Sequence, residues 1–159
     1  MTYWARSFAG LPEYVAEVRE CIRKVLGECE GVDLVELVAT ELASNAIRHS
    51  GSGEPGGKFT VHLAEFVDRW RVRVDDAGGS SVPHLCAALV IESAEDLDQV
   101  DVEAEAGRGL ELVAAVSSAW GVLGDTFARA VWADVLIPGS TRRRSLSEPI
   151  AAAWEENAQ

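Results

Sequence analysis

The chain has 159 residues, of which 48% are hydrophobic, and it carries a formal net charge of -12 with a pI near 4.6. That apolar content favours one compact domain with a substantial core. The excess of Asp and Glu argues against direct nucleic-acid binding, because neutralising phosphates requires clustered Lys and Arg, and it suits basic protein partners instead.

No basic segment followed by an apolar run opens the chain, and uncharged stretches such as residues 77–91 are shorter than a membrane span. We therefore expect a cytoplasmic protein that does not enter a membrane. Cys21, Cys29 and Cys86 are odd in number and lack a CxxC or Cys/His ligand spacing. This pattern favours free thiols over disulfides or a zinc site.

The first third of the chain predicts a strand and two helices. Residues 4–9 are short and partly aromatic, and the break that follows them should lead into a helix beginning near Pro12. A second helix should start at residue 32 or 33 and run to about Ser50, where the glycine-rich segment 51–57 ends the periodicity. Apolar residues recur at helical spacing in the first helix: Val15, Val18, Ile22, Val25 and Leu26.

Two segments with period-two alternation follow. Residues 58–66 and 70–78 are separated by a short turn, which predicts an antiparallel hairpin. Within the second segment, Trp70, Val72 and Val74 should share one face of the sheet.

The last third begins with an acidic segment, 92–106, that carries no compensating base and is typical of solvated, mobile chain. An apolar helix should start at about Gly107, and segments 120–124 and 128–138 predict a closing pair of strands. Residues 139–159 change composition to a basic run followed by an Ala-rich stretch, so we expect them to form an appended tail.

Polar side chains interrupt the apolar face of the second helix. At roughly 100° per residue, Glu41 and Asn45 stack within the apolar arc, and His49 lies a further turn along. A buried polar group without a partner costs on the order of 1–3 kcal/mol, and a bound ligand would supply the partners. The structural alternative is that Glu41 pairs with Arg48, Asn45 caps a loop and His49 ends the helix. The predicted arc comprises Leu34, Leu37, Val38, Leu42 and Ala46, with Glu36, Thr40 and Ile47 mostly opposite.

Two further segments carry residues suited to a ligand. Asp76 ends a predicted strand, where its carboxylate can accept a hydrogen bond from an exocyclic amine, and Gly78 lets the backbone pass close to a ligand. An ordinary Asp-Gly turn is the alternative. Gly107, Arg108 and Gly109 precede an apolar helix, whose N-terminal amides suit phosphate oxygens. A flexible hinge is the alternative there.

Helix, strand end and glycine segment, in this order, resemble the N, G1 and G2 boxes of the superfamily that contains gyrase, heat-shock chaperones, histidine kinases and mismatch-repair ATPases. The residues that carry the resemblance are "ELASNAIRHS", "DDAGG" and "GRGLELV". The chain looks like a Bergerat ATP-binding domain and, in its length, its "FAGLP" entry and its "ExxxNAIRH" wording, is most similar to the stand-alone anti-sigma factor serine/threonine kinases. The resemblance covers roughly residues 4–138.

The resemblance implies that the chain binds ATP with Mg²⁺. It makes Asn45 the ligand of the Mg²⁺ that bridges the triphosphate oxygens, a role that suits a carboxamide oxygen. It makes Glu41 the general base that orients or deprotonates the attacking hydroxyl group. Segment 92–106 would be the lid of the site.

The remaining roles concern the base and the phosphates. The resemblance implies that Asp76 accepts a hydrogen bond from the adenine amino group and that Gly78 allows close approach of the ring. A second group of residues would border or flank the phosphates: Gly107, Arg108, Gly109, Arg48 and His49. The chain departs from the family's G1 box, in which a second glycine commonly follows after one residue, because Gly78 and Gly79 are adjacent here.

The function expected from the resemblance is that of a kinase that sequesters a sigma factor and phosphorylates an anti-sigma factor antagonist. Homodimerisation is a family-level expectation. The alternative, of a different class, is a regulatory protein-binding module with weak or no nucleotide binding. A sensor histidine kinase is disfavoured, because His49, His62 and His84 all lie outside the first helix, where a phosphoacceptor would be needed.

The expected fold is an α/β two-layer sandwich with helices on one face of a mixed, mainly antiparallel sheet. Residues 1–138 would form the histidine-kinase-like ATP-binding domain, and residues 139–159 would be the tail. A gyrase-like or chaperone-like motor is disfavoured, because the chain has no room for a transducer domain.

Overall fold

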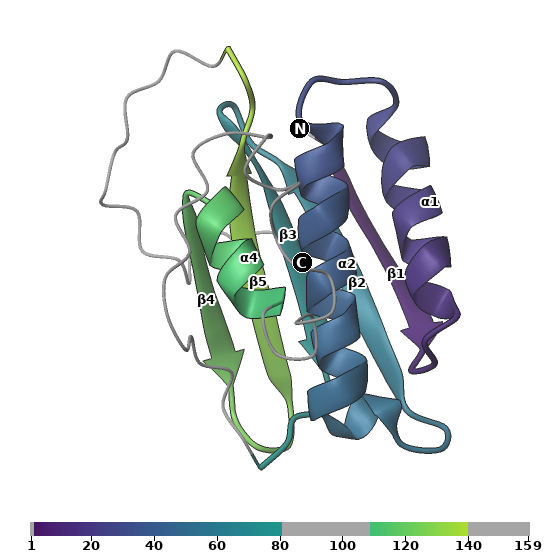
Figure 1. Ribbon diagram of the computed structural model, residues 1–159. Coiled ribbons are helices and arrows are strands. Elements are labelled where there is room, and N and C mark those ends of the chain that lie inside the picture. The colour runs from purple at the N-terminus through teal and green to yellow at the C-terminus, as the bar shows by residue number, and fades with distance from the viewer. Residues whose placement is uncertain (1, 81–108, 140–159) are drawn as a thin grey trace.

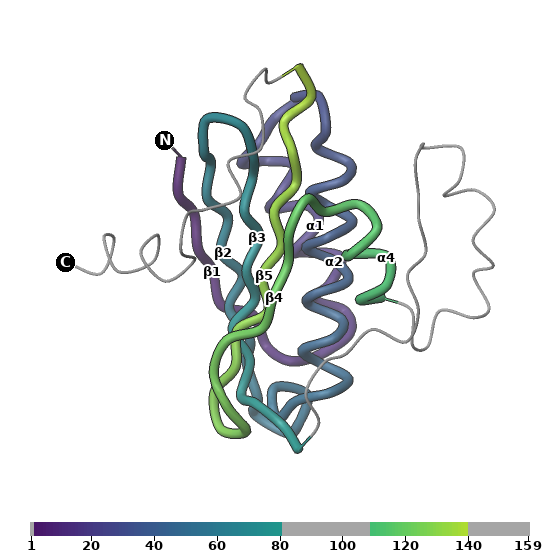
Figure 2. Tube along the Cα trace, turned by 90° about the vertical axis from the view of Figure 1, so that its left-hand side faces the viewer, coloured from purple at the N-terminus to yellow at the C-terminus, as the bar shows by residue number. Residues whose placement is uncertain are grey.

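A computed structural model describes residues 2–80 and 109–139 of the chain. The described residues form a sheet and a layer of helices on one of its faces, which Figures 1 and 2 show from two directions. The elements follow the order β1 (Tyr3–Ala9), α1 (Tyr14–Leu26), α2 (Val32–His49), the short 3-10 helix η1 (Gly51–Gly53), β2 (Lys58–Glu65), β3 (Arg69–Asp76), α4 (Gly109–Val116), β4 (Ala119–Gly124) and β5 (Arg129–Leu136).

The sheet has the strand order β1-β2-β3-β5-β4, and all four pairings among these strands are antiparallel. The predicted hairpin is confirmed as β2 and β3, and the predicted closing pair as β4 and β5. The two-layer α/β sandwich is therefore confirmed. The predicted second helix is α2, which begins and ends within a residue of its expected bounds.

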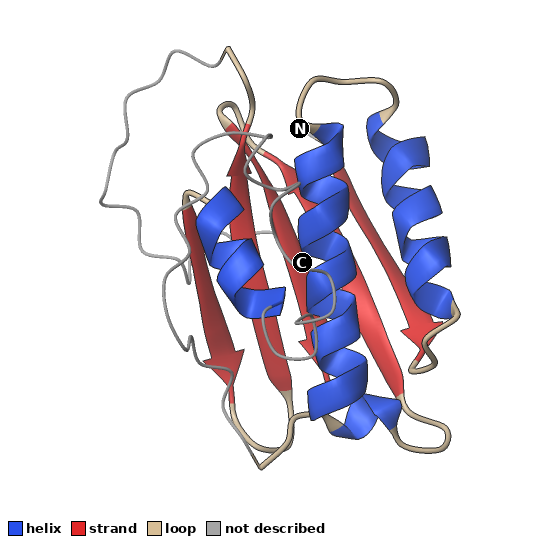
Figure 3. Cartoon of the chain, viewed as in Figure 1, coloured by secondary structure: helices blue, strands red, loops and turns tan. Residues whose placement is uncertain are grey.

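The helices lie side by side over the sheet, with α2 between α1 and α4 (Figure 3). Because alternate residues of a strand point to the same face of the sheet, Val72 and Val74 of β3 point to the helices. Val131 and Val135 of β5 point to the same side. These side chains form one core with the inward face of α2. As expected, Trp70 shares the face of Val72 and Val74.

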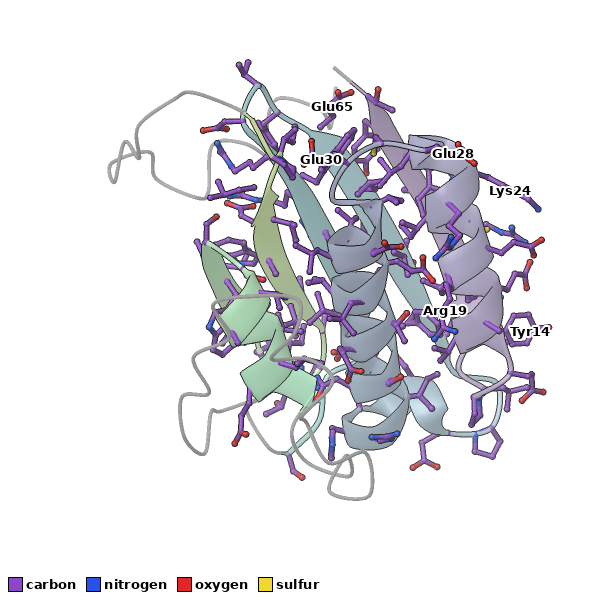
Figure 4. All side chains as sticks on the ribbon, turned by 45° about the horizontal axis from the view of Figure 1, so that its top comes forward. Tyr14, Arg19, Lys24, Glu28, Glu30 and Glu65 are labelled. Carbon is purple, nitrogen blue, oxygen red and sulfur yellow. The ribbon has the colours of Figure 1, made fainter. Side chains whose placement is uncertain are left out.

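The buried stripe of α2 is displaced from the predicted arc. Glu36 was expected on the outer side of the helix, and this expectation is wrong, because α1 covers that side. The Glu36 carboxylate lies 2.6 Å from Arg23 Nε and 3.2 Å from Arg19 Nε. Figure 4 labels Arg19 on α1. The buried residues of α2 are Val35, Glu36, Val38, Ala39, Leu42, Ala43 and Ala46.

The opposite face of the sheet also carries a buried ion pair. Arg71 of β3 and Asp134 of β5 are paired in register, with Nε to Oδ1 at 2.6 Å and Nη2 to Oδ2 at 2.8 Å. The Arg71 guanidinium lies 4.5 Å from the ring centroid of Trp132. Because both residues alternate with core-facing valines, this pair lies on the side away from α2.

Among residues 2–80 and 109–139, no helix combines the length and the apolar character needed to cross a bilayer. The predicted free thiols are found at Cys21, which is buried, and Cys29, which is half-buried. Cys86 and the acidic segment 92–106 lie outside the described residues, as does the tail beyond Gly139. The proposed boundary between domain and tail stays a prediction.

Candidate functional site

Helix α2 carries three of the candidate residues on successive turns. Glu41, Asn45 and His49 follow each other at four-residue spacing, so they lie along one side of the helix. A rise of about 1.5 Å per residue places Glu41 and His49 about 12 Å apart along the helix axis. Glu41 and Asn45 are half-buried, whereas the side chain of His49 is exposed at the last residue of the helix.

Gly109, the first residue of α4, meets α2 at Glu41. A Cβ atom built at Gly109 would lie 2.5 Å from Glu41 Oε2, so a side chain at this position would push the flexible Glu41 carboxylate aside. The structure thus brings together two of the predicted site residues from distant parts of the chain. It places the Glu41 carboxylate beside the N-terminus of α4. Gly107 and Arg108, predicted to border the phosphates, lie outside the described residues.

The Asn45 side chain has an unsatisfied donor. Its Nδ2 atom is buried and has no hydrogen-bond partner among the described residues. A buried donor without an acceptor costs on the order of 1–3 kcal/mol, and such a group calls for an explanation such as a bound ligand. A few other buried atoms share this property, among them Thr40 Oγ1, Trp70 Nε1 and Ser117 Oγ. Asn45 differs from them because it lies between Glu41 and His49.

Asp76 ends β3 with a nearly inaccessible carboxylate, whose side chain is 1% exposed. Its Oδ1 atom accepts a hydrogen bond of 2.7 Å from the backbone N–H of Gly78. Its Oδ2 atom lies 3.2 Å from Nε of Arg129, whose side chain is 3% exposed. The expected place of Asp76 at a strand end is confirmed, and its main partner is a residue that sequence reasoning missed.

Arg129 also reaches the end of α2. Its Nη2 atom donates a hydrogen bond of 3.3 Å to the backbone carbonyl of His49. A cation beside the last carbonyls of a helix is favourable, because these groups lack partners within the helix and carry partial negative charge. Arg129 therefore joins the ends of α2, β3 and β5 at one point.

The signal for Arg129 was present in the sequence. It occupies the same side of its strand as Val131, Ala133 and Val135, all of which belong to the core. Period-two alternation alone would have placed a guanidinium on the buried face of the sheet. A buried charge requires a partner, and the register pairs Arg129 with Asp76.

The backbone conformation explains why glycine occupies position 78, without any ligand. Its φ angle is +72°, and a Cβ atom there would lie 2.4 Å from the carbonyl oxygen of Thr126. Its own carbonyl accepts a hydrogen bond of 2.9 Å from Gly51 N–H. The turn after β3 thus demands a glycine, and the predicted contact of Gly78 with a purine ring stays a prediction.

A Mg²⁺ ion at the predicted position would take few ligands from the described residues. No group of three or more His, Cys, Asp or Glu residues within 2–80 and 109–139 is arranged to hold a metal ion. Mg²⁺ commonly takes only one or two protein ligands and completes its shell with phosphate oxygens and water. A single carboxamide oxygen, that of Asn45, fits this mode of binding.

Comparison with known proteins gives two findings. The family model described as histidine kinase-like ATPase domain matches residues 8–123. Over 73 residues, the chain is 29% identical to the serine-protein kinase RsbW of Listeria monocytogenes, with equal figures for serotype 4a strain HCC23, serotype 4b strain CLIP80459 and serovar 1/2a strain EGD-e. The aligned region covers 43% of this chain and 46% of each relative, so the match spans about half the length of these kinases.

Proposed function

Because the chain belongs to the histidine kinase-like ATPase domain family, we propose that it binds ATP with Mg²⁺ and phosphorylates a serine or threonine of an anti-sigma factor antagonist. We propose further that it sequesters a sigma factor. The partial similarity to serine-protein kinases supports the choice of a hydroxyl acceptor. The family membership supports nucleotide binding in general.

The observation that carries the proposal is the buried Nδ2 atom of Asn45, which has no hydrogen-bond partner among the described residues. An N–H group of this amide suits a phosphate oxygen, and its carbonyl oxygen suits a hard cation. The neighbouring turn of α2 supplies the carboxylate of Glu41, which lies beside the start of α4. Backbone N–H groups at a helix N-terminus favour phosphate oxygens. These groups match the parts that phosphoryl transfer requires.

In the proposed reaction, the hydroxyl oxygen of the acceptor attacks the γ-phosphorus of ATP and the bond to the β-phosphate oxygen breaks, leaving ADP. Glu41 orients the hydroxyl group and takes its proton. Asn45 would hold Mg²⁺, and this ion would neutralise charge on the phosphate oxygens. The chain contributes mainly position and charge, because phosphoryl transfer needs little covalent chemistry from the protein.

The carboxylate of Asp76, which lies at the end of β3, would accept a hydrogen bond from the adenine amino group. Gly109 would border the phosphates, together with Gly107 and Arg108, and His49 would flank them. Glu41 lies beside Gly109 in the middle of α2, whereas Arg129 joins Asp76 to the backbone carbonyl of His49 at the C-terminal end of the helix. This separation supports different places for the phosphates and the base.

The experiment incubates the purified chain with Mg²⁺, ATP labelled at the γ-phosphate and candidate anti-sigma factor antagonists. We expect phosphoserine or phosphothreonine on one antagonist, and about 100-fold slower transfer by Glu41→Gln with ATP affinity nearly unchanged. Glu20→Gln, which removes an exposed carboxylate from α1, serves as the control and should transfer at the parent rate. Absence of phosphorylated product with every antagonist would remove the kinase assignment.

The Glu41→Gln variant also distinguishes the kinase from the alternative function, a regulatory module without catalysis. A regulatory module that works by protein contact alone needs no general base. A Glu41→Gln protein that inhibits its sigma factor as well as the parent, and responds to the antagonist equally, would favour that module. The homodimer expected for such proteins is part of the proposal and is measured directly by sedimentation equilibrium.

A further inference from the structure

Asp76 and Arg129 form an unusual pair for a base-binding position. They stand directly opposite each other on β3 and β5, on the face that packs against α2. Both side chains are almost fully buried, at 1% and 3% exposure. Burying two opposite charges costs desolvation free energy, which the attraction between them offsets only when their hydrogen bonds are well satisfied.

The pair presents a hydrogen-bond acceptor beside a hydrogen-bond donor. Oδ1 of Asp76 accepts a hydrogen bond from Gly78 N–H and Oδ2 accepts one from Arg129 Nε, and a carboxylate offers about four acceptor positions. A guanidinium group carries five N–H donors, and those of Arg129 reach both Asp76 and the His49 carbonyl. Because the pair is shielded from water, hydrogen bonds to it are stronger than at an exposed site.

We propose that Arg129 is a second base-reading residue, donating a hydrogen bond to ring nitrogen N1 of adenine while Asp76 accepts from the 6-amino group. This inference rests on the proposed binding of ATP. Adenine offers a donor at its 6-amino group and an acceptor at N1 on adjacent ring positions, which complements an adjacent carboxylate and guanidinium. Guanine reverses the two, with an acceptor at O6 and a donor at N1. In the same pose, O6 would face the carboxylate of Asp76 and N1–H would face the guanidinium group of Arg129, so neither hydrogen bond could form.

The test is a calorimetric titration of the full chain, with Mg²⁺ present, using ATP, 1-deaza-ATP and purine riboside triphosphate. The second ligand replaces N1 by C–H, and the third lacks the 6-amino group. We expect 1-deaza-ATP to bind the parent about 10- to 100-fold more weakly than ATP, the range for a hydrogen bond to a charged group. In Arg129→Met this penalty should fall below about threefold, while the penalty for the missing amino group remains.

Arg71→Met is the matched control. Arg71 is buried to a similar degree and is paired with Asp134, but it lies on the opposite face of the sheet. This variant should keep the parent's full preference for ATP over 1-deaza-ATP, so that a general loss of stability is separated from a lost base contact.

The parent alone decides the matter if Arg129→Met does not fold. A parent that binds ATP and 1-deaza-ATP equally overturns this inference and leaves the proposed function intact. A parent that binds none of the three ligands overturns the proposed function, and this inference falls with it. Retention of the N1 preference by folded Arg129→Met likewise overturns the role of Arg129.

Discussion

Gly109 approaches the carboxylate of Glu41 so closely that a methyl group at position 109 would lie 2.5 Å from Oε2. The two residues belong to α4 and α2, which pack against each other on the sheet (Figure 1). The contact limits where the carboxylate can lie, since the backbone of α4 closes one side of it. The glycine at the start of α4 therefore leaves room for the carboxylate of the proposed general base.

Gly109→Ala should separate folding from activity. Alanine is favoured over glycine in a helix by up to about 1 kcal/mol, so the free energy of unfolding should change by no more than about that amount. The added methyl group must displace the Glu41 carboxylate, and a misplacement of about 1 Å can slow a reaction on the order of 100-fold. Phosphate transfer and urea unfolding, measured on the same preparation, check both parts. Full activity in this variant would contradict the role given to Glu41.

The buried ion pairs on the helix-free side predict an order of stabilities. Asp134 contacts two guanidinium groups, since Arg69 Nε lies 3.1 Å from its Oδ2 in addition to the contacts of Arg71. Asp134→Asn should cost about 3–5 kcal/mol, because it leaves buried positive charge without a partner. Arg71→Met should cost less, because Asp134 keeps Arg69. Urea unfolding measures both, and the reverse order would show that Arg71 is held mainly by Trp132.

Asp75 predicts how stability depends on pH. Burial raises the pKa of this carboxyl group, but hydrogen bonds from His62 and Arg73 outweigh it, and the net result is a pKa below the ordinary value of 3.8. A carboxyl group whose pKa is lower in the folded state stabilises the fold above its unfolded pKa and loses this contribution as pH falls through the folded pKa. The loss therefore occurs below 3.8.

Asp75→Asn tests this directly. Between about pH 5 and pH 2, the free energy of unfolding of the parent should fall more steeply than that of the variant, and the two should converge at the acid end. Urea unfolding at a series of pH values gives the two curves. Parallel curves would show that Asp75 contributes no pH-dependent stability.

Alternation and helical spacing were sufficient to predict the hairpin, the closing strands and the long second helix, because each of these buries one face against the core. They were insufficient for Glu36. Periodicity shows that a helix has an apolar side, but it does not show that a second helix with arginines covers an adjacent side. That arrangement depends on where α1 packs, which is a tertiary property.

Arg129 was missed for a related reason. Its partner Asp76 lies on another strand, and only the register of β3 with β5 brings the two together. Asp76, in contrast, was found because its strand end and the following glycine are local features. The close approach of Gly109 to Glu41 also requires the packing of two helices that are distant in sequence.

The most direct test is a calorimetric titration of ATP into the parent chain and into Asn45→Ala, each with and without Mg²⁺. If the amide of Asn45, whose Nδ2 atom lacks a partner among the described residues, serves nucleotide and cation, the parent should bind ATP more tightly with Mg²⁺. Asn45→Ala should lose that enhancement while remaining folded. A folded Asn45→Ala protein that binds ATP like the parent, with the same gain from Mg²⁺, would contradict the account.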